Sequence, residues 1–87
     1  MTLTIGTTVV RIVNKDIPHT EVYLWTGDTI YIGFNEQKLN YTPTSGFKLP
    51  ANEVVKIEYR GDIFAVSTSA NQSLEVMLIP DIGQKSL

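Results

Sequence analysis

The sequence contains no cysteine and a single histidine, His19. Without cysteine, disulfides cannot stabilise the fold and thiolate zinc sites are excluded. One histidine offers no set of imidazole ligands, so we expect no metal and no cofactor. His19 follows Pro18 in a stretch of turn-forming residues, which predicts a histidine on a surface loop.

Charge is also scarce, because only 18% of the residues are charged, below the roughly 25% typical of soluble domains. The seven basic residues form no run, and the formal net charge is −2. Nucleic-acid binding needs a basic stripe that neutralises phosphates, so we expect no nucleic-acid partner. A lightly charged surface suits contact with other protein, and it equally suits a β-rich chain with Thr, Ser and Tyr on its wet faces.

Long apolar runs are missing as well. No segment approaches the ~18 consecutive apolar residues of a membrane span, so we expect no membrane partner. The first residues lack the charged start and apolar core of a signal peptide, which predicts synthesis in a cytosol.

Catalytic groups do not form a recognisable set. Nucleophilic catalysis needs a base held by a third group, and His19 is the only histidine that can serve. The acidic candidates Asp16, Glu21 and Asp28 fall in turns or at strand ends, where carboxylates are expected anyway. The glycines lie too far apart for a phosphate-binding loop. We therefore expect no catalytic residues and a protein that is not an enzyme.

One tripeptide, Arg60-Gly61-Asp62, matches a cell-adhesion signal. Gly-Asp is equally the ordinary chemistry of a turn between two strands, and we interpret the tripeptide as a turn.

The dominant pattern is alternation of apolar and polar residues at period two, which is typical of β-strands. The expected strands cover residues 7–14, 20–25, 29–34, 47–49, 53–59, 63–68 and 73–79. So many strands in 87 residues need two packed layers or a closed barrel. We predict one all-β domain, a small antiparallel β-sandwich or barrel of six to seven short strands. The second and third strands are expected to form a hairpin and the last three a meander. The ends, residues 1–6 and 81–87, are expected to be flexible.

Four aromatic residues are candidates for an interface: Tyr23, Trp25, Tyr31 and Tyr41. Tyr23 and Trp25 project opposite to Val22 and Leu24 if residues 20–25 form a strand. Exposed aromatic side chains anchor protein interfaces or stack on sugar rings, and a strand covered on both faces buries them in a core. The sequence leaves these three roles open.

Residues 31–80 carry a series of short steps in a fixed order. The steps are Tyr31-Ile32-Gly33, Thr44-Ser45-Gly46-Phe47-Lys48-Leu49-Pro50-Ala51, Glu53-Val54-Val55-Lys56-Ile57, Gly61-Asp62-Ile63-Phe64-Ala65-Val66-Ser67 and Leu74-Glu75-Val76-Met77. In this order they resemble small structural proteins of tailed bacteriophages, of the head decoration, cement or head-fibre type. Asn52 departs from the pattern, which usually has glycine there. Asparagine tolerates a left-handed backbone nearly as well, so we expect the turn to survive.

The resemblance implies a virion structural protein that forms a homo-oligomer and binds the capsid surface. The partners it implies are further copies of the chain, with a trimer as the expected number, and the major capsid protein or another virion protein. Such a protein is made in the host cytoplasm and resides in the virion. The flexible ends are then expected to act as arms between subunits. The alternative is a tail, fibre or baseplate module that recognises a host-surface glycan, which requires the four aromatic residues to gather in one exposed groove.

Overall fold

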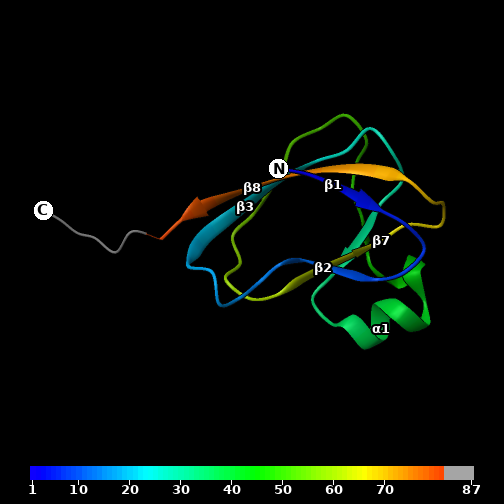
Figure 1. The fold of residues 1–87 in the computed structure, drawn as a ribbon, viewed down its shortest axis with the longest axis horizontal. Helices are drawn as coiled ribbons and strands as arrows, with labels where there is room; N and C mark the ends of the chain where they lie inside the picture. Colours follow the sequence, from blue (N-terminus) through cyan, green and yellow to red (C-terminus); the bar gives the residue numbers. More distant parts are fainter. Residues whose placement is uncertain (82–87) are drawn as a thin grey trace, which may run out of the picture.

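The computed structural model describes residues 1–81, apart from the side chains of Tyr41 and Pro43. Within that part of the chain, eight strands and two short helical segments follow one another (Figure 1). The strands are β1 (Thr2–Ile5), β2 (Val10–Val13), β3 (His19–Trp25), β4 (Tyr31–Gly33), β5 (Phe47–Lys48), β6 (Val55–Ile57), β7 (Ile63–Val66) and β8 (Gln72–Pro80). The helical segments are the α-helix α1 (Glu36–Tyr41) and the 3-10 helix η1 (Pro43–Ser45). Every expected strand is present, and β1 is an additional one.

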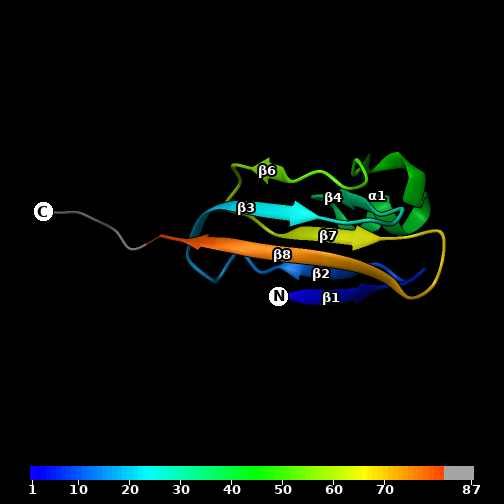
Figure 2. The ribbon, with the colours of Figure 1, turned by 90° about the horizontal axis from the view of Figure 1, so that it is seen from above.

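The strands form two antiparallel sheets of four strands each. Sheet A has the order β1-β8-β3-β6, and sheet B has the order β2-β7-β4-β5. Figure 1 shows β1, β8 and β3 in one layer, β2 and β7 in the layer beneath, and α1 below sheet B. Figure 2 shows β8 and β3 running side by side along the length of the molecule. The predicted all-β antiparallel sandwich is confirmed.

The apolar core lies between the two sheets. Period-two alternation puts every second side chain of β3 and β8 into it, as with Val22 and Leu24, or Leu74 and Val76. The core cluster consists of Ile5, Ile12, Val13, Val22, Leu24, Ile30, Ile32, Leu49, Ile63, Ala65, Leu74 and Val76. Each fully buried Val, Leu or Ile side chain contributes roughly 1.5–3 kcal/mol, so these side chains are the main source of stability.

The expected strand pairings are wrong at two points. β3 and β4 are not a hairpin, because β3 lies in sheet A and β4 in sheet B. The last three strands are not a meander either, since β6 pairs with β3, β7 with β2 and β4, and β8 with β1 and β3. The chain crosses from one sheet to the other at each of these turns.

Thr26 shows how the chain makes the first of these crossings. Its side chain is buried, and its hydroxyl donates to the Ser73 carbonyl (2.7 Å) while accepting from the Asp28 amide (3.0 Å). The chain is therefore fixed to the start of β8 as it leaves sheet A. Ile30 and Ile32 then enter the core from the opposite side, both almost fully buried.

The N-terminal residues form β1, so the flexible end expected for residues 1–6 is wrong. β1 pairs with β8 in a register that sets Leu3 opposite Leu74, and Ile5 is fully buried. The terminal ammonium of Met1 donates to the Val76 carbonyl (3.1 Å), and the Val76 amide donates to the Met1 carbonyl (2.8 Å). At the other end, residues 82–87 of the expected flexible segment lie outside the described residues.

The connection between β4 and β5 contains α1. The Asn35 side chain accepts a hydrogen bond from the Lys38 amide (3.0 Å), which is the usual N-cap of a helix. Leu39 is 1% exposed, and its side chain lies against Gly33 of β4. A single buried leucine thus fixes this short helix to the outer face of sheet B.

Asn52 has a φ of 63°, so the left-handed turn expected at this departure from the phage pattern is confirmed. Replacing Asn52 by alanine is expected to lower the free energy of unfolding by about 1 kcal/mol. Alanine is strained in the left-handed conformation, because it lacks the short polar side chain with which asparagine can hydrogen-bond to the nearby backbone. Asn52→Gly, the matched control, should be neutral within about 0.5 kcal/mol. Urea unfolding measures both, and equal stability of Asn52→Ala and the parent protein would contradict the explanation.

Candidate functional site

The outer face of sheet A carries two of the four aromatic candidates, the half-buried Tyr23 and the exposed Trp25. Val22 and Leu24 of β3 point into the core, so Tyr23 and Trp25 point outward. Across the sheet, Tyr23 lies opposite Met77 of β8, and Trp25 lies opposite Glu75. Side chains directly opposite one another on one face are close enough to touch.

These side chains belong to an apolar surface that we call the outer-face patch, formed by Met1, Tyr23, Trp25, Val54 and Met77. They line a shallow groove of about 310 Å³ across sheet A. The exposed fraction is 39% for Trp25, 56% for Met77 and 66% for Val54. Apolar side chains grouped on one face of a small domain, rather than scattered singly, mark an interaction surface.

Three charged side chains flank the outer-face patch. The Lys56 ammonium lies 3.6 Å from the Glu21 carboxylate, and the Tyr23 hydroxyl donates to the same carboxylate (3.1 Å). Glu75 accepts a hydrogen bond from the Thr2 hydroxyl, and no basic side chain among residues 1–81 forms an ion pair with it. Glu75 is therefore the charge beside the patch that is left for an external partner.

The four aromatic candidates do not gather in one groove. Tyr31 lies opposite Val66 on sheet B, between the core residues Ile30 and Ile32, so it points away from the core on the other side of the sandwich. The side chain of Tyr41, at the end of α1, lies outside the described part of the structure. Tyr23 and Trp25 are thus the pair that the fold brings together.

Sequence reasoning missed Met1, Val54 and Met77. Met77 could be found from alternation, because it lies between the apolar residues Val76 and Leu78 in the strand expected at residues 73–79. Its contact with Tyr23 depends on the pairing of β3 with β8, and residues 54 positions apart carry no local signal of that pairing. Val54 precedes β6 and joins the patch because β6 pairs with the other edge of β3.

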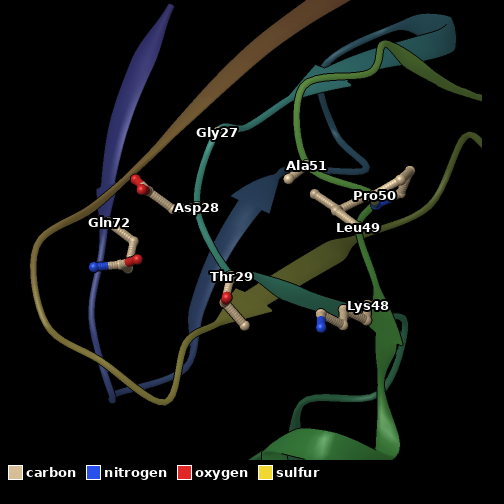
Figure 3. A pocket seen from close by; sticks show the side chains of 8 residues that line it. All are labelled: Gly27, Asp28, Thr29, Lys48, Leu49, Pro50, Ala51 and Gln72. Atoms are coloured by element: carbon tan, nitrogen blue, oxygen red, sulfur yellow. The ribbon is translucent and has the colours of Figure 1, made fainter.

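A second, more polar cleft of about 470 Å³ lies between the β3–β4 and β5–β6 connections. Figure 3 shows residues 27–29 along one side and 48–51 along the other, with the Asp28 side chain turned away toward β8. There Asp28 accepts a hydrogen bond from the Ser73 amide (2.8 Å), and the Asn52 amide donates to the Thr26 carbonyl (2.7 Å). Asp28 is thus used to hold the loops together, and Lys48 is the one other ionisable side chain in the lining.

His19 is at the start of β3 and is 2% exposed, so the surface histidine expected from the sequence is wrong. Its Nδ1 lies 2.6 Å from the Ile17 carbonyl oxygen, which orients the ring. The buried Nε2 has no hydrogen-bond partner among the described residues. Because solvent barely reaches the ring, His19 cannot meet a substrate at the surface.

The Arg60-Gly61-Asp62 tripeptide is held within the fold. Arg60 forms an ion pair with Asp81 (2.6 Å), and the Asp62 carboxylate accepts from the Lys15 amide (2.7 Å). The Arg11 guanidinium lies 3.9 Å from the same carboxylate. The tripeptide thus lies in the connection between β6 and β7, with a bend at Gly61, and both charged side chains contact other segments of the chain.

Within residues 1–81, no three His, Cys, Asp or Glu side chains gather as metal ligands would. The described part of the chain also has no helix that is long and apolar enough to span a membrane. What the fold and this site define together is a small antiparallel β-sandwich with an exposed apolar patch on the outer face of sheet A. No family model, curated protein or solved structure matches this chain.

Proposed function

We propose that this chain is a non-enzymatic virion structural protein that oligomerises and docks on a capsid surface, and that it makes protein contacts through the outer-face patch. The observation that carries the proposal is the grouping of Trp25, Met77 and Val54, all exposed, on one face of sheet A. Aromatic residues and methionine are enriched at the centres of protein interfaces, and charges are depleted there. The patch has this composition, with its charges at the flanks.

The virion role is supported by the resemblance of residues 31–80 to phage decoration, cement and head-fibre proteins. Two steps of that resemblance coincide with positions that the fold requires. Gly46 lies against the Ile32 carbonyl, and Asp62 anchors the Lys15 amide. The shared steps thus favour a shared fold, and the role is carried over from the fold by analogy.

A glycan-binding module is the less favoured alternative. It needs several aromatic rings on one exposed groove, and Tyr31 lies on the opposite side of the sandwich from Tyr23 and Trp25. Beside Tyr23, Trp25 and Glu75, the groove is lined by Met1, Val54 and Met77, whose aliphatic and thioether groups suit a protein surface better than sugar hydroxyls.

Trp25→Ala is expected to weaken binding to assembled capsids by about tenfold or more, because a central tryptophan is the usual energetic anchor of an interface, and losing a contact between copies also lowers the avidity of capsid binding. The measurement is co-sedimentation of the purified chain with capsids assembled without it. Phe47→Ala is the matched control, since Phe47 is more exposed than Trp25 (57% against 39%) but lies on β5 of sheet B. Loss of binding by both variants to the same degree, or by neither, would count against the patch as the contact.

A further inference from the structure

The charges around the outer-face patch are arranged on opposite sides of β3. Glu75 lies on β8, level with Trp25, and Lys56 lies on β6, level with Tyr23. β8 and β6 are the two neighbours of β3 in sheet A. An acidic side chain and a basic side chain therefore stand one strand to either side of an aromatic centre, about 5 Å from it in each direction.

This arrangement is self-complementary. A two-fold contact brings the same surface of both copies together, so each charge must meet its opposite after the rotation. The midpoint between Glu75 and Lys56 falls over β3, between Tyr23 and Trp25. Consider a two-fold axis that passes above that point, parallel to the sheet and at right angles to the line from Glu75 to Lys56. Rotation about this axis places Glu75 of one copy over Lys56 of the other.

We propose that the protein partner of the outer-face patch is a second copy of this chain, in a symmetric dimer in which Glu75 of each copy pairs with Lys56 of the other. This inference rests on the proposed function, because it assumes that the patch is a protein contact. Tyr23, Trp25, Met77 and Val54 form the apolar centre of the dimer. Both ion pairs then flank that centre.

Standard strand spacings give the packing angle. Glu75 and Lys56 are about 10 Å apart across the strands and about 7 Å apart along them. The axis is then tilted by about 35° from β3, and the strands of the two sheets cross at about 70°. This angle lies near the orthogonal class of sheet packing.

Two features of the monomer agree with this contact. Glu75 has no basic partner among the described residues, and the pair between Lys56 and Glu21 is long (3.6 Å) and leaves the lysine side chain 48% exposed. Lys56 can therefore accept a second carboxylate without leaving the first. On the other side of the sandwich, Leu39 packs α1 against part of the outer face of sheet B, whereas Trp25, Val54 and Met77 beside sheet A stay exposed.

The test is sedimentation equilibrium of the full chain over a wide concentration range. The parent protein is expected to pass from one to two copies as concentration rises. Glu75→Lys alone places two lysines together at both contacts, and Lys56→Glu alone places two carboxylates together. Each single variant is expected to dissociate about tenfold more readily or worse.

A mixture of the two single variants provides the sharpest control. In a mixed dimer both contacts become attractive, so dimers are expected to return when two preparations that are each monomeric are combined. The double variant Glu75→Lys, Lys56→Glu is likewise expected to dimerise as the parent does. Because all three proteins carry surface changes only, circular dichroism should show the same fold.

A parent protein that stays monomeric at high concentration would overturn the dimer, as would a trimer, the number expected from the sequence. So would dimers that both single charge reversals leave unchanged. Capsid co-sedimentation is a separate readout: a monomer that still binds capsids through Trp25 refutes the dimer alone. A dimer that responds to the charge reversals but ignores capsids refutes the virion role alone.

Discussion

Replacing Leu74 by alanine is expected to lower the free energy of unfolding by about 3 kcal/mol. Leu74 is fully buried near the start of β8, where it lies opposite Leu3 of β1 and belongs to the core between the sheets. The substitution removes the transfer free energy of the lost carbons and leaves a cavity that a rigid sandwich fills only in part. In a domain of 87 residues, such a loss is a large share of the total stability.

Met77→Ala on the same strand is the matched control. Met77 is 56% exposed on the outer face, so its removal should change the stability of the monomer by less than about 0.5 kcal/mol. Urea unfolding at a concentration where the protein is monomeric measures both variants, with the slope of the transition checked for constancy. If Leu74→Ala unfolded at the same urea concentration as Met77→Ala, β8 would not face the core as described.

The second large effect is expected at Gly46. A Cβ at this position would stand 2.6 Å from the Ile32 carbonyl oxygen and 2.6 Å from Cδ1 of Leu39. The first of these atoms is backbone of β4, which pairs with β5, and cannot yield without shifting the strand. Gly46→Ala is therefore expected to lower the free energy of unfolding by about 2 kcal/mol and to loosen α1 from sheet B.

Gly6→Ala separates this steric effect from the general effect of removing a glycine. No atom lies within 4 Å of a Cβ built at Gly6, so this variant should equal or exceed the parent in stability, by up to about 1 kcal/mol. Hydrogen exchange adds a local readout, because the Leu39 amide should lose protection in Gly46→Ala alone. Equal stability of the two variants would show that the close approach of Gly46 to β4 is wrong.

The sequence could predict the strands but not their partners. Alternation locates residues such as Val22 and Leu24 on one face, because the side-chain period of a strand is two. It does not distinguish a hairpin, in which both strands share a sheet, from a crossing, in which they face each other across the core. Both arrangements bury Leu24 and Ile32 equally well, and for this reason the expected hairpin and meander were wrong.

Two elements had signals too weak to be found. β1 has only Leu3 and Ile5 at alternate positions, and its identity as a strand depends on β8 as its partner. α1 is six residues long, and Leu39, the one buried side chain among residues 36–40, gives no helical period. The N-cap residue Asn35 gave no signal of a helix, because asparagine is common both at helix N-caps and in turns.

The candidate site was predictable only in part, because the sequence shows which side chains share a strand face but not which strands are neighbours. Tyr23 and Trp25 follow from alternation within one strand, whereas the patch as a whole requires β8 and β6 beside β3. The self-complementary charges, Glu75 and Lys56, come from strands that are separate in the sequence, and only the sheet order places them on either side of β3. Tyr31 failed to join them because the chain changes sheets after Thr26.

The central claim is that the outer-face patch is buried against protein in the assembled state. Oxidative footprinting read by mass spectrometry tests it most directly, because exposed methionine and tryptophan side chains react readily and Met77 yields a sulfoxide. The dilute monomer is compared with the chain bound in assembled particles. We predict strong protection of Met77 and Trp25 in the particles, while Phe47 on sheet B reacts at its monomer rate or is protected less. Unchanged oxidation of Met77 and Trp25 in the particles would contradict the claim.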